Sequence, residues 1–210
     1  MSRDWSLTMK VSAIVLAAGR SVRMGQPKML MPWGETTVLG RVIQTIRAAG
    51  IEDIVLVTNS EIAGRITNDD LHIVLNDDGE MLTSLQCGLR ALLGSPSSIL
   101  PGQDGKGQAE AALICLGDQP QVREGSVRLV CEAFQETKSN LVVPSYHMRR
   151  GHPWLAARAL WDEILSMREP ATMRDFLNRH NAEILYVESG TPAILQDLDT
   201  PDDYLKHKPR

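Results

Sequence analysis

The sequence predicts a three-layer α/β/α protein with a Rossmann-like, mostly parallel sheet between two layers of helices. Two observations predict it: short runs rich in Val, Ile and Leu alternate with longer amphipathic segments, and the runs lack a regular apolar-polar alternation. Strands of a parallel sheet show this pattern because helices bury both of their faces. The 210 residues suffice for a single domain, which we place at residues 10–208 after a flexible leader at residues 1–9.

Six mostly apolar runs are expected to form the strands: Val11–Leu16, Asp53–Thr58, His72–Leu75, Ala111–Leu116, Leu141–Pro144 and Glu183–Val187. The first run and its flanks also resemble a signal peptide weakly, and we favour the strand because cleavage would destroy the motif that follows.

Five segments between the strands are expected to be helical: Thr37–Ala49, Met81–Leu93, Glu124–Thr137, Pro153–Met167 and Thr172–Arg179. From Val38 to Ile46 the apolar residues recur with i, i+3, i+4 spacing, and Gly50 ends that helix. The stretch Ser95–Gln108 is rich in Ser, Pro and Gly and predicts a mobile surface loop.

Composition excludes several classes of protein. The net charge is −4 and aromatic residues make up 4% of the chain, whereas nucleic-acid binders show a basic excess or aromatic stacking platforms. No apolar run approaches the ~18 residues that cross a bilayer, so we expect no membrane partner. Cys87, Cys115 and Cys131 lack C-x-x-C spacing and indicate free thiols in a reducing compartment, the cytoplasm, with Cys115 as a small buried hydrophobic residue.

A glycine-rich basic loop follows the first strand. It carries Arg20, Arg23 and Lys28 and no acidic residue, and Gly19 and Gly25 permit a tight turn with exposed peptide N–H groups. Arginine holds phosphate oxygens in a bidentate fashion and lysine acts as a point charge. The loop therefore predicts a triphosphate cradle, although its spacing matches neither a Walker A loop nor G-x-G-x-x-G.

Two acidic positions are candidates for metal ligands. Asp118 directly follows the run Ala111–Leu116, at the strand end where α/β sheets bind ligands, and the alternative is a turn or cap residue. Near the C-terminus, Asp197 and Asp199 share one side of an extended segment, and we slightly favour Asp199. Carboxylates together with substrate phosphates suit Mg²⁺.

Other acidic residues have simpler explanations. Thr200-Pro201 resembles a helix start, so Asp202 and Asp203 are interpreted as first-turn or capping residues. A second cluster is interpreted as a solvated loop at Asp69 and Asp70, while at Asp77 and Asp78 the loop and the metal site stay equally open.

Substrate contacts are expected at two further places. Arg149, Arg150 and His152 precede a proline and suit an anionic acceptor, with a surface turn as the alternative. Asn76 and Ser84 follow the third strand and either cap the next helix or contact the ribose or base.

The loop sequence L-A-A-G-R-S-V-R-M-G-Q-P-K at residues 16–28 resembles the signature of the MobA-like nucleotidyltransferases. G-D-Q-P at residues 117–120 and D-L-D-T-P-D-D at residues 197–203 also resemble that family, closest to its molybdenum cofactor cytidylyltransferases. The resemblance implies the nucleotide-diphospho-sugar transferase type of fold. It departs at residues 168–174, where glycines of the cytidylyltransferases are absent.

The resemblance also implies roles for individual residues. The nucleotide would lie against Leu16, Ala17, Ala18, Gly19, Asn76 and Ser84, with Arg23 and Lys28 on the triphosphate. Asp118 and Asp199 would hold Mg²⁺, and Arg150 and His152 would contact the acceptor. Catalysis would rest on Arg23, Lys28 and Asp118.

We therefore expect Mg²⁺-dependent transfer of a nucleoside monophosphate to a phosphorylated acceptor with release of pyrophosphate. By the same resemblance, Ala18 favours CTP over GTP and molybdopterin is the expected acceptor, with a molybdoenzyme or cofactor-handling protein as a further partner. GTP, a sugar phosphate or another small phosphorylated metabolite, and a non-catalytic nucleotide-binding regulator stay open as alternatives.

Overall fold

The computed structural model describes residues 10–66, 71–94 and 109–209. The expected leader at 1–9, the expected surface loop Ser95–Gln108 and the acidic pair Asp69 and Asp70 lie outside the described residues.

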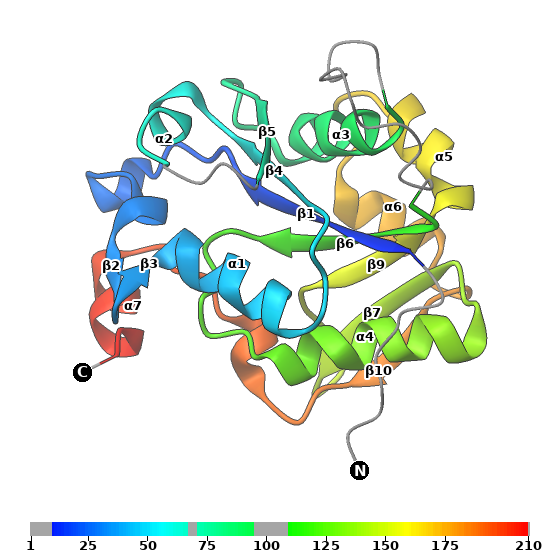
Figure 1. Cartoon of the computed structure of the whole chain (residues 1–210). Helices are drawn as coiled ribbons and strands as arrows, with labels where there is room; N and C mark the ends of the chain where they lie inside the picture. Colours follow the sequence, from blue (N-terminus) through cyan, green and yellow to red (C-terminus); the bar gives the residue numbers. More distant parts are fainter. Residues whose placement is uncertain (1–9, 67–70, 95–108, 210) are drawn as a thin grey trace.

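An eight-stranded sheet forms the centre of the molecule (Figure 1). Its strand order is β10-β7-β9-β6-β1-β4-β5, with β8 paired to β7. The strands are β1 (Val11–Ala17), β4 (Ile54–Thr58), β5 (His72–Leu75), β6 (Ala111–Leu116), β7 (Leu141–Tyr146), β8 (Arg149–Arg150), β9 (Trp154–Ala157) and β10 (Leu185–Glu188). All six expected strands are present within a few residues of their predicted bounds. Among the described strands of this sheet, β8 and β9 pair antiparallel with their neighbours and the others pair parallel with one another.

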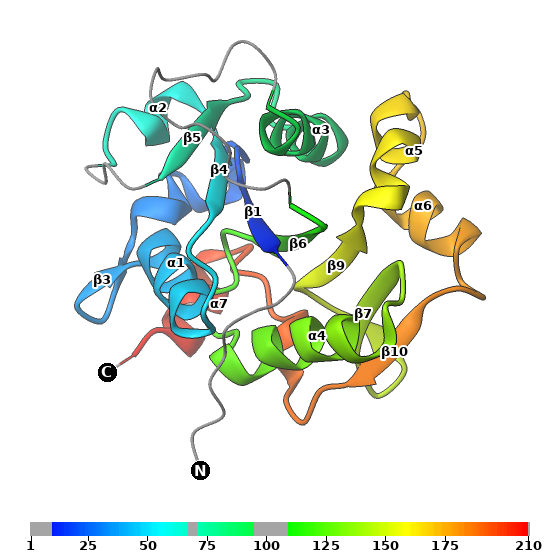
Figure 2. The same cartoon turned by 45° about the vertical axis from the view of Figure 1, so that its right-hand side comes forward.

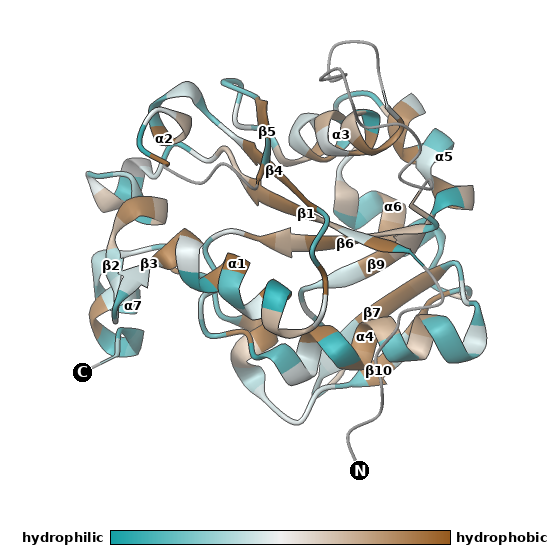
Figure 3. Cartoon of the chain, viewed as in Figure 1, coloured by the Kyte–Doolittle hydropathy of each residue, from teal (hydrophilic) through white to brown (hydrophobic). Residues whose placement is uncertain are grey.

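Helices cover both faces of the sheet (Figure 2). One face packs against α1 (Val38–Ala48) and α4 (Glu124–Thr137), and the other against α3 (Met81–Leu92), α5 (Trp161–Ser166) and α6 (Met173–Arg179). Along β1, Ala13 and Val15 belong to the first core, and Ile14 and Leu16 belong to the second. Central strands such as β1 and β7 are accordingly mostly brown, while the helices carry both brown and teal residues (Figure 3). The predicted three-layer architecture is confirmed.

One expected helix is wrong. The segment Pro153–Met167 begins with β9, whose four residues are all buried, and becomes α-helical only at Trp161. A strand buried on both faces and a buried helix share the same short apolar run, so periodicity does not separate them. Because β9 runs antiparallel to β6 and β7, the chain before it comes from the side of the sheet where those two strands have their carboxyl ends. The residues before β9 are therefore placed at the carboxyl ends of the parallel strands by a strand, and not by the expected helix.

The predicted helix ends agree with the structure. The Thr37 side chain accepts from Gly40 N–H at the start of α1, and Gly50 follows its end with φ +92°. Thr200 and Asp203 form a reciprocal capping box at the start of α7 (Pro201–His207), which confirms the capping interpretation of Asp203.

A third, smaller core attaches α7 to the N-terminal half of the chain. It is formed by Met24, Met31, Trp33, Val38, Leu198 and Tyr204. The Tyr204 hydroxyl donates to the Pro32 carbonyl at 2.6 Å, within the hairpin of β2 (Pro32–Trp33) and β3 (Thr36–Thr37). This contact places the segment before α7 beside the basic loop.

The cysteines behave as expected from the sequence. All three are free, and Cys115 and Cys131 are buried. Burial raises the pKa of both thiols, to about 12 for Cys131, so Cys115 is confirmed as a small hydrophobic core residue. In the part of the chain that the structure describes, no helix has the length and apolar character needed to cross a bilayer.

Candidate functional site

The basic loop is held against β4 by two side chains. Thr58 Oγ1 donates to the Ala17 carbonyl at 3.1 Å, and Asn59 Nδ2 donates to the Ala18 carbonyl at 3.2 Å. Asn59 also caps the short helix α2 (Ser60–Ala63). These two bonds fix the first turn of the loop, so its backbone is set before any ligand arrives.

The loop then turns back on itself to place Lys28. Ser21 and Gly25 have positive φ values of 51° and 66°, a conformation that costs glycine little. The Ser21 hydroxyl accepts from the Lys28 N–H at 3.1 Å. Lys28 then opens a short 3-10 helix, Lys28–Leu30, with its side chain 11% exposed.

Three segments far apart in the sequence meet at one charged cluster. Lys28 Nζ lies 2.5 Å from Asp118 Oδ2 and 3.5 Å from Asp199 Oδ1. Arg23 Nη2 lies 3.2 Å from Asp199 Oδ2, on the exposed side. The structure therefore brings together four of the residues that the sequence singled out for the triphosphate and the metal.

Backbone contacts connect the two carboxylate segments. Leu198 N–H donates to the Asp118 carbonyl at 3.1 Å, and the fully buried Leu198 side chain belongs to the core that attaches α7. Asp199 is therefore placed by the packing of the residue before it. Substitution of either carboxylate leaves this backbone bond in place.

Asp197 has a different environment from Asp199. Its Oδ1 accepts from Gln119 Nε2 at 2.6 Å. Burial raises the pKa of Asp197, and Asp118 and Asp199 nearby raise it further, although the Gln119 bond opposes them. The geometry thus favours Asp199 as the partner of Asp118, and it adds Gln119, which the sequence reading missed because the residue contacts a segment 78 positions away.

The donor set of the cluster fits a hard divalent cation. One ammonium group contacts both Asp118 and Asp199, so the two carboxylates are close enough to share a single cation. Among residues 10–66, 71–94 and 109–209, no group of three or more His, Cys, Asp or Glu side chains is arranged to hold a metal. Two carboxylates that leave positions for water and phosphate oxygens are typical of Mg²⁺.

Gly117, the residue before Asp118, is packed too closely to hold a larger side chain without a shift of its neighbours. A Cβ at Gly117 would lie 2.9 Å from Ala17 Cβ, 3.1 Å from the Leu16 carbonyl oxygen and 3.2 Å from Met29 Sδ. Gly117→Ala must therefore push the Asp118 turn away from the segment that carries Lys28. We expect a stability loss of about 1–3 kcal/mol in urea unfolding, and a displacement of about 1 Å lowers turnover ~10²-fold. Gly125→Ala, at an open position in α4, is the control, and unchanged activity of Gly117→Ala would contradict the packing argument.

Asn76 and Ser84 hydrogen-bond to one another rather than facing solvent. Both are buried, and Asn76 Nδ2 donates to Ser84 Oγ at 2.9 Å. Asn76 Oδ1 accepts from Asp78 N–H, and a Cβ at Gly79 would lie 3.3 Å from the Ala18 carbonyl. The loop after β5 therefore packs directly on the basic loop, and this pair shapes it.

The acidic residue Asp77 has a local structural role. It accepts from the N–H and the hydroxyl of Ser60, both at 2.8 Å, and these bonds lower its pKa. Its carbonyl accepts from Arg20 Nη2 at 3.1 Å. The geometry therefore favours the loop interpretation of Asp77 over the metal site.

Arg150 is held by three protein acceptors. Its Nε donates to the Tyr186 hydroxyl at 2.8 Å, and its two terminal nitrogens donate to Asn178 and Asn181 at 2.8 and 2.7 Å. These bonds tie β8 to α6 and β10. The neighbouring Arg149 is exposed. The geometry favours a positioning role for Arg150 and makes Arg149 the more accessible cation of the pair.

His152 lies at the edge of the sheet in a neutral state. Its backbone N–H donates to the Ile194 carbonyl at 3.0 Å. Gly151 permits this close approach, since a Cβ there would lie 2.5 Å from the same oxygen. Burial lowers the pKa of the imidazole to about 4, although the residue keeps part of its surface in contact with solvent. At neutral pH His152 thus offers a hydrogen bond rather than a positive charge.

The buried imidazole makes stability depend on pH. The folded pKa of about 4 lies below the value of about 6.5 in an unfolded chain. Between these values the unfolded state binds the extra proton, so stability present above pH ~6.5 is lost as the pH falls. Between pH 7.5 and pH 5, the free energy of unfolding of wild type should fall by about 1–2 kcal/mol more than that of the His152→Gln variant, which has no imidazole to protonate. Urea unfolding at the two pH values measures this, and an equal fall in the free energy of unfolding of both proteins would contradict the expectation.

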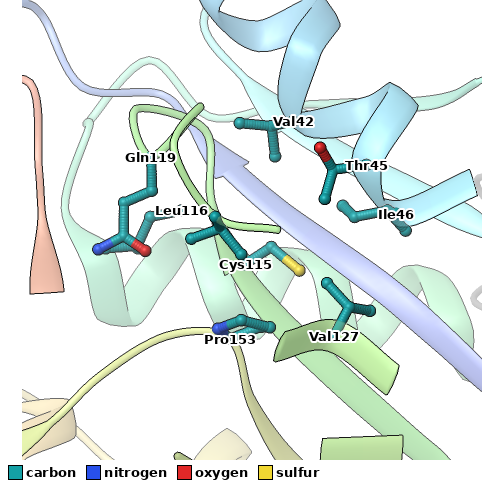
Figure 4. A pocket seen from close by; sticks show the side chains of 9 residues that line it. Val42, Thr45, Ile46, Cys115, Leu116, Gln119, Val127 and Pro153 are labelled. Atoms are coloured by element: carbon teal, nitrogen blue, oxygen red, sulfur yellow. The ribbon is translucent and has the colours of Figure 1, made fainter. Parts of the chain in front are cut away.

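A small apolar crevice lies between α1, the end of β6 and the start of α4 (Figure 4). It is lined by Val42, Thr45, Ile46, Cys115, Leu116, Gln119, Val122, Val127 and Pro153. Gln119, which also contacts Asp197, connects it to the charged cluster. Lys28, Asp118 and Asp199 do not line it, so we do not assign the triphosphate to this crevice.

Comparison with known proteins identifies the family and supports the fold. A family model described as a MobA-like NTP transferase domain matches residues 13–184. The chain is 26% identical to the molybdenum cofactor cytidylyltransferase of Escherichia coli, over 95% of this chain and 96% of that protein. A Mycobacterium tuberculosis protein solved in complex with manganese is similar, with a TM-score of 0.69, 25% identity and coverage of 94% and 97%. A nucleotidyl transferase from Methanothermobacter shares the fold, with a TM-score of 0.72, 22% identity and coverage of 95% and 96%.

Proposed function

Because the chain belongs to the MobA-like NTP transferase family, we propose that it transfers CMP from CTP to molybdopterin and releases pyrophosphate. The observation that carries the proposal is the cluster of Arg23, Lys28, Asp118 and Asp199, in which two cations and two carboxylates from three segments converge. Such a cluster suits a substrate that brings both a triphosphate and a divalent cation.

The nucleotide is assigned to the basic loop and the segment that supports it. Leu16, Ala17, Ala18 and Gly19 offer backbone contacts at the end of β1, and Arg23 and Lys28 offer charge to the triphosphate. Asn76 and Ser84 support the nucleotide side by holding the loop after β5 against the basic loop.

The chemistry requires little beyond positioning and charge. A phosphate monoester on the acceptor attacks the α-phosphate, and pyrophosphate leaves in line. The attacking oxygen is already anionic, so no side chain has to remove a proton from it. Arg23 and Lys28 stabilise the charge that develops on the pyrophosphate. Asp118 and Asp199 would hold Mg²⁺, which when bound neutralises phosphate oxygens and aligns them.

The acceptor is assigned to the turn before β9. This turn lies at the same sheet edge as the loop after β6 that carries Asp118. His152 supplies a neutral hydrogen-bonding group and Arg149 supplies an exposed charge. Arg150 positions β8, which carries Arg149 and precedes His152. Molybdopterin is favoured by the similarity to the Escherichia coli cytidylyltransferase over nearly the whole of both chains. A molybdoenzyme or cofactor-handling protein in the cytoplasm would then receive the product.

A pyrophosphate-release assay tests the proposal. Purified protein with Mg²⁺ and molybdopterin should release pyrophosphate from CTP, more slowly from GTP, and from neither without the acceptor. Preferential use of GTP would replace CTP in the proposal, and release with a sugar phosphate instead of molybdopterin would replace the acceptor. Nucleotide binding without any release would favour a non-catalytic regulator and overturn the proposal.

A further inference from the structure

The ammonium group of Lys28 stands where a cation shared by Asp118 and Asp199 would stand. It contacts an oxygen of each, at 2.5 and 3.5 Å. The Lys28 and Asp118 side chains are 11% and 16% exposed, so water screens this contact only weakly. Together with Arg23, which contacts the other oxygen of Asp199, Lys28 brings two positive charges to the two carboxylates.

A divalent cation that bound the same two oxygens would meet this ammonium. Metal-oxygen distances near 2 Å place the ion inside the space between the carboxylates. Two positive charges at such a short distance repel each other strongly when solvent is largely excluded. Lys28 and the metal therefore compete for one position, and they cannot both occupy it.

The triphosphate offers Lys28 another anionic partner. Lys28 ends the basic loop that begins at Gly19, and Arg23 on that loop already reaches Asp199 from the exposed side. A lysine side chain is a point charge on a flexible four-carbon stem, so it can turn from a carboxylate to a phosphate oxygen without moving the backbone. The backbone of Lys28 is meanwhile retained by the Ser21 hydroxyl.

We propose that Lys28 is an exchangeable occupant of the metal position, so that nucleotide and metal binding are coupled. This inference rests on the proposed function for the identity of the nucleotide. The free protein binds a divalent cation weakly, and a triphosphate that draws Lys28 away raises the affinity of Asp118 and Asp199 for the metal. By linkage the metal raises the affinity for the triphosphate by the same factor. The protein thereby avoids binding metal in the absence of substrate.

A purely structural role for Lys28 predicts the opposite change in metal affinity when the ammonium group is removed. If the ammonium only holds the two carboxylates together for the metal, its removal weakens metal binding. If it occupies the metal position, its removal strengthens metal binding. The sign of the change therefore separates the two roles.

The test is a titration of the full chain with Mn²⁺ alone, in which binding is measured by calorimetry or from the paramagnetic resonance signal of free Mn²⁺. We expect Lys28→Met to bind Mn²⁺ at least about tenfold more tightly than wild type, within the usual range of coupling between sites. Lys28→Gln, which keeps a donor for Asp118 but no charge, should behave alike and serves if Lys28→Met folds poorly. Lys206→Met removes an exposed lysine of α7 and should match wild type. The double variant Lys28→Met/Asp118→Asn should lose the gain.

A second arm adds a non-hydrolysable CTP analogue, with correction for the Mn²⁺ that the analogue itself binds. The analogue should raise the Mn²⁺ affinity of wild type by a clearly larger factor than that of Lys28→Met, in which only the phosphate oxygens offered to the metal contribute. Equal or weaker Mn²⁺ binding by both Lys28 variants would overturn the inference. The first arm contains neither nucleotide nor acceptor, so a failure of nucleotidyl transfer would contradict the proposed function without changing its result.

Discussion

Asp118→Asn is expected to lower kcat by about 10³-fold, near the upper end of the range for a group that stabilises transition-state charge. The change removes one of the two carboxylates in contact with Lys28 and leaves the size of the side chain unaltered. Asp118→Ala should abolish turnover. The fold should survive both changes, because the Leu198 N–H bonds to the Asp118 backbone carbonyl and not to its side chain.

Pyrophosphate release and circular dichroism measured on the same preparations check this prediction. Asp202→Asn is the matched control, since Asp202 is an exposed carboxylate in the first turn of α7, close in sequence to Asp199. It should retain wild-type activity. Wild-type activity in Asp118→Asn would remove Asp118 from the metal site and with it the central part of the proposed function.

Lys28→Ala is expected to lower kcat/KM by ~10²-fold or more, by analogy with the loss of other groups that stabilise transition-state charge. Lys28 is the buried cation of the cluster, and its removal leaves Asp118 and Asp199 without their shared partner. Any gain in metal affinity does not restore the rate, because the charge on the leaving pyrophosphate has lost its stabiliser. The loss should appear in both KM for the nucleotide and kcat.

Steady-state kinetics at saturating Mg²⁺ measure this effect, with Lys206→Ala on α7 as the control. Lys28→Arg should recover only part of the activity, because a planar guanidinium does not fit a position that a compact ammonium occupies between two carboxylates. Full activity of Lys28→Ala at saturating nucleotide would limit Lys28 to binding and contradict its assignment to the leaving group.

The features that the sequence predicted well are local ones. The strand β1 and the turn after it could be read from an apolar run that ends in glycine, and α7 from Thr200-Pro201 with acidic residues behind it. Each depends on residues within a few positions of one another. The segment Trp154–Ala157 was the exception. It forms a strand because its backbone pairs with β6 on one side and with β7 on the other, and this pairing is not visible in the local sequence.

The candidate site divides in the same way. The sequence supplied Arg23, Lys28, Asp118 and Asp199 as separate candidates, with a resemblance to one family as the reason to join them. It left Asp197 and Asp199 almost equal, and the structure favours Asp199 because Asp197 is engaged by Gln119. It also favoured Arg150 as a substrate contact, where the structure shows a guanidinium held by Tyr186 and two asparagines.

By itself, then, the sequence determined the three-layer fold, the basic loop after β1 and the carboxylate after β6, since periodicity and turn chemistry act over short distances. Only the tertiary structure decided that Lys28 meets carboxylates 90 and 171 residues away. The contact with Asp118 follows from the pairing of β1 with β6, and the contact with Asp199 depends on Tyr204 and Leu198 packing α7 against the N-terminal half of the chain. Burial of apolar side chains drives such packing and has no direction along the chain, so the pairing of distant charges follows from the folded core and not from local pattern.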